Sequence, residues 1–173
     1  MISGNFVRHV WSLFDFLQTQ ANLDACIQEK DAFPPPSLQF FGNGFMKYEF
    51  NDASGALNKF RRVKFNFRTL QKDGLLLYGP SEDLQGVFAS FELKDGHLVY
   101  RYNSGEGDGN KMLSSKGILP PLNDGVVHFV NKGRKTLKID NVLIAEYTKS
   151  SQDLSAQFAY IGGVPFGQKM TAR

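Results

Sequence analysis

Apolar and polar residues alternate along residues 62–107, and this alternation predicts β-strands. Within residues 63–68 one Val and two Phe are separated by Lys and Asn, as in a strand with one buried face. The same period of two recurs at Val87–Leu93, and the segments Leu75–Tyr78 and His97–Asn103 complete the set. The stretch therefore predicts four consecutive antiparallel strands, and we expect an all-β protein.

Turn signals separate these strands and recur through the rest of the chain. Asp95-Gly96 is typical of a two-residue type I′ hairpin, because such a turn needs positive φ and Gly adopts it without steric cost. Further short strands are expected at residues 38–40, 44–50, 126–131, 136–140, 142–147 and 158–163, with a possible short strand within 111–121. Short strands at this spacing predict a sandwich of two antiparallel sheets.

Residues 1–36 differ from the rest. Their apolar residues recur at helix-like intervals without a clean face, so both a short amphipathic helix and an extended strap laid across the sandwich remain open. Pro34–Pro36 then breaks any regular element. We interpret residues 1–36 as a strap or linker from a preceding domain, and residues 37–173 as the sheet domain.

Composition narrows the class of protein. The chain has 173 residues, of which 42% are hydrophobic, so it is long enough and apolar enough for one folded domain. A formal net charge of +3 is compatible with acidic glycans and falls short of a nucleic-acid signature. The chain contains no run of 18 apolar residues, so no transmembrane helix is predicted. The only cysteine, Cys26, is a buried thiol or half of a bridge to a cysteine outside this chain.

Candidate catalytic residues are sparse. His9, His97 and His128 lie on unrelated segments without the spacing of metal ligands, and His128 is interpreted as a packed or surface histidine. The glycine run Gly105–Gly109 lacks the following helix of a phosphate loop. A glycosidase would need two carboxylates on one sheet face, whereas the outward positions offer only Glu92. We therefore predict that the chain is not an enzyme.

Two basic clusters are the candidate binding residues. Each is interpreted either as an ordinary solvated face or as a site for sulfated glycan, which needs several cations because each exposed ion pair contributes little. The candidate residues are Arg61, Arg62 and Lys64 in the first cluster, and Lys132, Arg134, Lys135 and Lys138 in the second.

Four segments in succession resemble a laminin G-like domain. They are VKFNFRTLQKDGLLLYG, FASFELKDGHLVYRYNSGEG, LNDGVVHFV and FAYIGGVP, which together with the opening strand cover residues 37–170. The preceding WSLFDFLQTQANLDACIQ and SLQFFGNGFMKYEF are similar to the join between the first and second G-like domains of laminin α chains. The resemblance implies a jelly-roll sandwich of two curved antiparallel sheets.

The resemblance also implies a function and a location. Members of the family are non-enzymatic adhesion modules of basement membranes and cell surfaces, so we expect a secreted extracellular fragment of a larger chain. Their partners are integrin or dystroglycan-like receptors, heparin-like glycans and neighbouring G-like domains. The alternatives are a spacer domain in a tandem array, and a lectin-like or small-ligand-binding jelly roll of a neurexin- or agrin-like protein.

A calcium site at one rim of the sandwich is implied only in part. The family places an Asp where this chain has Val87, and a hydrophobic side chain cannot supply the oxygen that Ca²⁺ requires. Asp83, Ser104 and Asp153 are the residues that match the remaining positions or replace the missing ligand. The family also ends with a further strand after its Gly-Gly element, which this chain is expected to lack.

Overall fold

The computed structural model describes residues 9–12 (backbone only), 37–42, 44–49, 62–80, 86–103, 110–146 and 158–165, and these residues form strands and no helix. No helix in this part of the chain is therefore able to cross a membrane. The strands are β1 (His9–Ser12), β2 (Ser37–Phe40), β3 (Met46–Glu49), β4 (Val63–Arg68), β5 (Gly74–Pro80), β6 (Phe88–Lys94), β7 (His97–Asn103), β8 (Lys111–Ser114), β9 (His128–Lys132), β10 (Thr136–Ile139), β11 (Val142–Glu146) and β12 (Phe158–Ile161).

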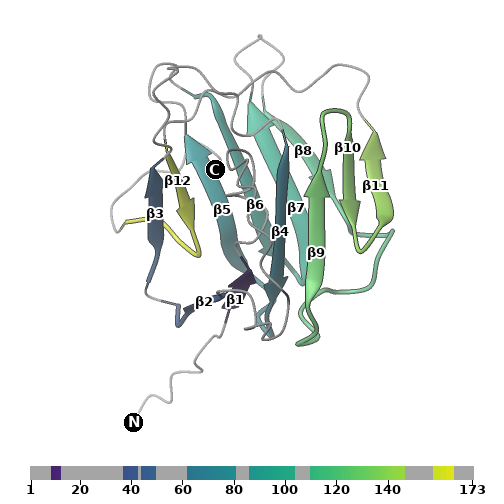
Figure 1. Cartoon of the computed structure of the whole chain (residues 1–173). Coiled ribbons are helices and arrows are strands. Elements are labelled where there is room, and N and C mark those ends of the chain that lie inside the picture. The colour runs from purple at the N-terminus through teal and green to yellow at the C-terminus, as the bar shows by residue number, and fades with distance from the viewer. Residues whose placement is uncertain are drawn as a thin grey trace, which may run out of the picture.

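The strands form two six-stranded sheets that face one another (Figure 1). Sheet A has the order β11-β10-β9-β4-β1-β2, and sheet B has the order β3-β12-β5-β6-β7-β8. Neighbouring strands within both sheets pair antiparallel. The predicted all-β sandwich of two antiparallel sheets is confirmed.

The four consecutive strands predicted between residues 62 and 107 all exist, but they do not form one meander. β4 belongs to sheet A and β5 to sheet B, so residues 69–73 form a corner between the sheets. β4 pairs instead with β9 and β1, and β5 pairs with β6 and β12. The physical reason is burial, because two apolar sheet faces cover each other when consecutive strands separate into opposite layers.

The main core lies between the two sheets. The inward side chains of β4 meet those of β6, and the rings of Phe65 and Phe91 pack edge to face with centroids 5.3 Å apart. Phe91 in turn stacks on Tyr100 of β7 at 4.6 Å. These aromatic contacts bury large apolar area and favour specific ring geometries, so they fix how the sheets face each other.

Two hairpins have the backbone that their sequences require. Asp95 and Gly96 both have positive φ, 52° and 79°, which confirms the predicted type I′ turn between β6 and β7. Asp140 and Asn141 also have positive φ, 49° and 66°, in the turn between β10 and β11. Asp and Asn adopt this conformation more readily than most residues that carry a side chain.

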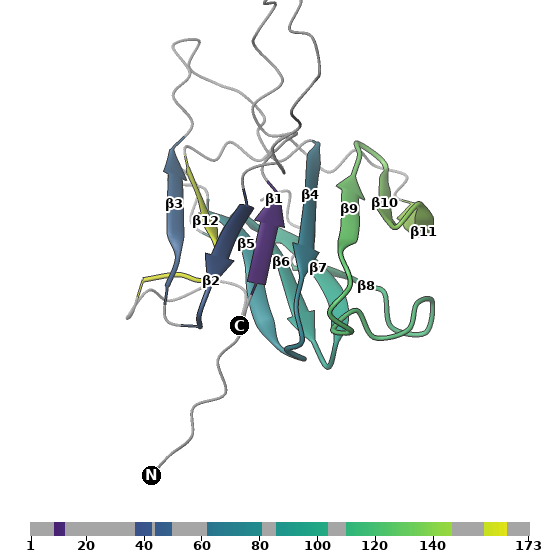
Figure 2. The same cartoon turned by 60° about the horizontal axis from the view of Figure 1, so that its bottom comes forward.

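The N-terminal strand β1 is part of sheet A. It pairs with β2 on one side and β4 on the other, and Figure 2 shows it between them. Residues 9–12 therefore follow the extended alternative, not the helical one. These four residues pair within sheet A, and the expected boundary at residue 36 stays a prediction.

Gly162 follows β12 and lies where no side chain fits. A Cβ at this position would approach the ring of Phe40 on β2 to 2.5 Å, and Gly162 has a φ of 77°. Its N–H donates a hydrogen bond to the Leu76 carbonyl, 3.1 Å away. The first glycine of the Ile-Gly-Gly sequence is thus explained by its contact with Phe40 at the edge of sheet A.

We expect Gly162→Ala to destabilise the domain by about 2–5 kcal/mol, because positive φ costs an L-residue about 1–2 kcal/mol and overpacking about 1–3 kcal/mol. Gly117→Ala is the matched control, since Gly117 has a φ of 83° and nothing within 4 Å of the added Cβ. Urea unfolding measures both variants. Equal losses of stability would contradict the role assigned to Phe40.

Candidate binding surface

Strand alternation sorts the side chains of sheet A into two faces. On β4, Val63, Phe65 and Phe67 are buried against sheet B, and the residues between them point outward. Lys64 pairs with Asn131 on β9, and Asn131 pairs with Lys138 on β10. The three side chains therefore form one row across the outer face. Neighbouring strands lie about 4.8 Å apart, which places the two lysine backbones about 10 Å from each other.

The turn between β9 and β10 extends this row. Arg134 and Lys135 are exposed in the turn, which is closed by a 2.8 Å hydrogen bond from the Gly133 N–H to the Thr136 carbonyl. Arg62 precedes β4 at the same end of the sheet, since Val63 pairs with the last residue of β9.

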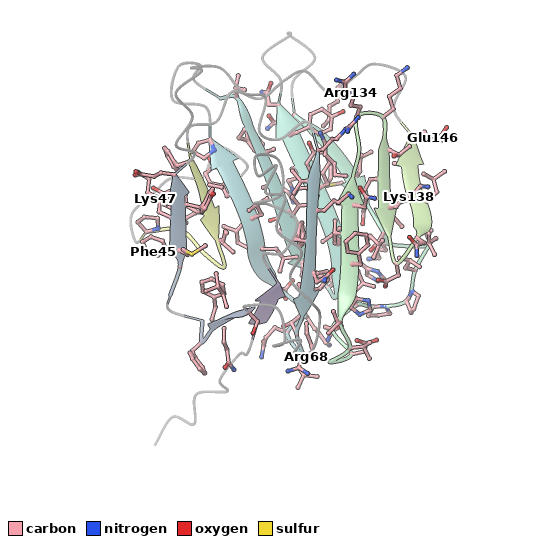
Figure 3. The ribbon with its side chains drawn as sticks, viewed as in Figure 1. Phe45, Lys47, Arg68, Arg134, Lys138 and Glu146 are labelled. Carbon is pink, nitrogen blue, oxygen red and sulfur yellow. The ribbon has the colours of Figure 1, made fainter. Side chains whose placement is uncertain are left out.

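We call these five exposed cations the basic surface: Arg62, Lys64, Arg134, Lys135 and Lys138. Figure 3 shows Arg134 and Lys138 along the β9–β10 side of sheet A, with Arg134 at the upper end. The pairing of β4 with β9 thus unites two clusters that lie 70 residues apart in the chain.

Lys132 does not belong to the basic surface, which corrects its assignment to the binding site. It is 1% exposed, because it follows Val130 on the inward face of β9. Its ammonium lies 5.8 Å from the centroid of the Tyr100 ring, at the limit of a cation–π contact. The residue was grouped with Arg134 and Lys135 by proximity in sequence, whereas the period of two along β9 already indicated an inward position.

Two residues at the basic surface were not foreseen. Asn131 separates the two lysines of the row and offers an amide group there. Glu146 of β11 is exposed opposite Thr136 and places one carboxylate at the border of the surface (Figure 3). The sequence alone does not indicate that either residue belongs to this surface, because only the strand register shows that they lie beside its lysines and its turn. Arg61 lies outside the described residues.

The predicted calcium residues, Asp83, Ser104 and Asp153, also lie outside the described residues, so that site stays a prediction. Val87 is described, and its side chain is 6% exposed within the main core. Pro80 pairs with Phe88 and Phe88 with Asn103, so the strand ends that flank two of the three loops lie side by side at the same end of sheet B. In the described part of the chain no group of three metal-ligating side chains occurs.

His128 is buried between two carboxylates, as expected for a packed histidine. Its Nδ1 lies 2.8 Å from Asp140 Oδ2, and its Nε2 lies 3.0 Å from Asp124 Oδ1. Asp140 also accepts a 2.7 Å hydrogen bond from the Phe129 N–H. The imidazole therefore ties the turn before β9 to the turn after β10, and both of its nitrogens are engaged within the fold.

Comparison with known proteins supports the fold. The family model of the laminin G domain matches residues 67–173. The mouse basement membrane-specific heparan sulfate proteoglycan core protein is 29% identical over 143 aligned residues, in an alignment that covers 73% of this chain and 4% of that protein. Human pikachurin is 33% identical over 99 residues, 56% of this chain and 9% of pikachurin. The LG1-3 region of the laminin α2 chain superimposes with a TM-score of 0.54 at 26% identity, covering 75% of this chain and 26% of that one.

The two-sheet sandwich is therefore a laminin G-like jelly roll, as predicted. Because the family model covers more than half of the sequence, the chain belongs to the laminin G domain family. The chain spans less than a tenth of the length of these two full-length relatives.

Asp124 yields a prediction about pH. The Val126 N–H, 2.8 Å away, and to a smaller extent His128, lower the pKa of Asp124 below its ordinary value. A lowered folded pKa stabilises the protein above the ordinary Asp pKa of about 3.9, and this contribution disappears as the pH falls through the folded value.

We therefore expect Asp124→Asn to lower the free energy of unfolding, and to lower it more at pH 7 than at pH 3. The difference should be below about 1 kcal/mol, because the carboxylate is half-exposed. Asn keeps an oxygen for the Val126 N–H, so the comparison isolates the charge. Urea titrations at both pH values measure it, and a gap independent of pH would contradict the electrostatic role.

Proposed function

We propose that this domain is a non-enzymatic adhesion module of an extracellular matrix or cell-surface protein, and that it binds sulfated glycans through the basic surface. The observation that carries the proposal is the pairing of β4 with β9, which joins two separate basic clusters into one row of exposed cations. Relatives in a basement membrane proteoglycan and in pikachurin support the class of protein.

The arrangement of the cations favours a long polyanion over a small anion. Lys64 and Lys138 lie in one row across three strands, with their backbones about 10 Å apart, so a sulfated chain laid across the strands contacts each in turn. Each exposed ion pair contributes only about 0.2–1 kcal/mol, and useful affinity therefore requires several in line. Arg134 and Lys135 extend the line at the turn.

The position of this domain within a longer protein is also a proposal. The aromatic segment before residue 37 and the opening strand after it support the second G-like domain of a laminin-type α chain, secreted into basement membranes. Integrin or dystroglycan-like receptors and neighbouring G-like domains are the partners that such a position implies. Relatives far longer than this chain support an origin within a multidomain protein. The other use of such a domain is as a spacer in a tandem array.

Charge reversal at the β9–β10 turn tests the glycan proposal. Arg134→Glu with Lys135→Glu should weaken binding to heparin about 2- to 30-fold, since two exposed ion pairs together contribute about 0.4–2 kcal/mol. The variant should elute from a heparin column at lower salt than wild type, as expected for a screened electrostatic contact.

The matched control is Lys94→Glu with Lys116→Glu, which changes the net charge equally at exposed positions outside the basic surface. If both double variants lose the same retention, the effect is one of net charge and the site is wrong. If wild type is not retained at physiological salt, the spacer function replaces the proposed one.

A further inference from the structure

An exposed apolar patch lies at the lower end of sheet A, opposite the end that carries Arg134. Leu70, Val126 and Val127 are 72%, 59% and 56% exposed, although they lie beside the well-packed strands β4 and β9. We call these three residues the lower patch. Single exposed apolar residues are common, but neighbouring ones of this size mark interaction surfaces.

The lower patch is held in place by the backbone. The Gly125 N–H donates to the Thr69 carbonyl at 3.1 Å, and the Asn123 amide lies 3.4 Å from the Leu70 carbonyl. A Cβ on Gly125 would lie 3.1 Å from Leu70 Cδ2, so the leucine side chain rests directly over the glycine. The corner after β4 and the turn before β9 therefore present their apolar side chains as one surface. Such a preordered surface loses little conformational entropy on binding.

Charges of opposite sign flank the lower patch. Arg68 is exposed on the β4 side, and Figure 3 shows it pointing away from the lower end of that strand. Asp124 and Asp140 lie on the β9–β10 side, both in contact with His128, with side chains 49% and 41% exposed. The lower end thus has an apolar centre, a basic side and an acidic side.

We propose that the lower patch is the interface of a homodimer related by a two-fold axis. A two-fold axis that passes through the patch places the apolar side chains of one copy against those of the other. The same rotation places the basic side of each copy against the acidic side of its partner. Such self-complementarity is the requirement of an isologous interface. An apolar centre with a charged rim is also the usual composition of protein interfaces.

The dimer would also affect glycan binding, a consequence that rests on the proposed function. The basic surface lies at the opposite end of sheet A, so dimerisation through the lower patch leaves both basic surfaces exposed and directed outward. A long sulfated chain then meets two binding surfaces, and the second contact becomes intramolecular. Dimerisation raises avidity for long chains and leaves the affinity for a short fragment unchanged.

Sedimentation equilibrium of the 173-residue chain from micromolar to millimolar concentration tests the interface. We expect wild type to form dimers, and Leu70→Asp and Val127→Asp to remain monomeric over the same range. Met112→Asp is the matched control, because Met112 is 62% exposed on β8 in the other sheet and its change introduces the same charge. A monomeric wild type, or dimers that persist in both patch variants, would overturn the proposal.

Arg68→Glu tests the two-fold arrangement of charges. It should weaken the dimer in low salt and reverse the sign of the salt dependence, because the substituted side chain would repel the partner's acidic side and salt screens that repulsion. Association unchanged or strengthened by Arg68→Glu would overturn this arrangement.

Binding of a short heparin fragment to Leu70→Asp separates the two proposals. If wild type forms no dimers but Leu70→Asp and wild type bind the fragment equally, only the interface proposal is overturned. Dimers without fragment binding overturn the glycan site alone.

Discussion

The pairing of β4 with β9 is the interaction on which the rest of this structure depends. It joins segments more than 60 residues apart, and its ladder runs from Val63 opposite Lys132 to Phe67 opposite His128. Its inward side chains supply the sheet A half of the core, including the Phe65 ring that packs on Phe91 of sheet B. Its outward side chains begin the cationic row. Such a long-range pairing forms only after a large loop has closed, so the core must offset that loss of entropy.

Each end of the β4–β9 ladder brings together residues from distant parts of the chain, and the two ends carry different kinds of side chain. At the upper end Arg62 lies beside the β9–β10 turn, and at the lower end the corner after β4 lies beside the turn before β9. Residues from unrelated parts of the chain are thereby placed together on an ordered frame. One end collects exposed cations and the other collects exposed apolar side chains between opposite charges. The proposed glycan site and the proposed dimer interface therefore lie at different ends of the sandwich.

Burial in this domain also constrains the charged groups it contains. Lys132 is held inside the sandwich near the Tyr100 ring, and His128 is held between two carboxylates. Both lie on the inward face of β9, where polar groups are stable only if they have partners. These residues hold the strand in register and fasten its turns, so their role is structural. The exposed cations, by contrast, are available because alternation turns them outward.

The sequence by itself determined the local structure of this protein. The period of two fixed the strands, and positive-φ residues such as Asp95-Gly96 fixed the hairpins, because both depend on neighbouring residues only. The motif pattern was specific enough to predict the family. Only the tertiary structure decided that β4 and β5 lie in opposite sheets, that Lys132 is internal, and that Lys64 and Lys138 share one row. Those facts depend on which distant strands pair, and pairing is set by the mutual burial of two sheets and not by any local pattern.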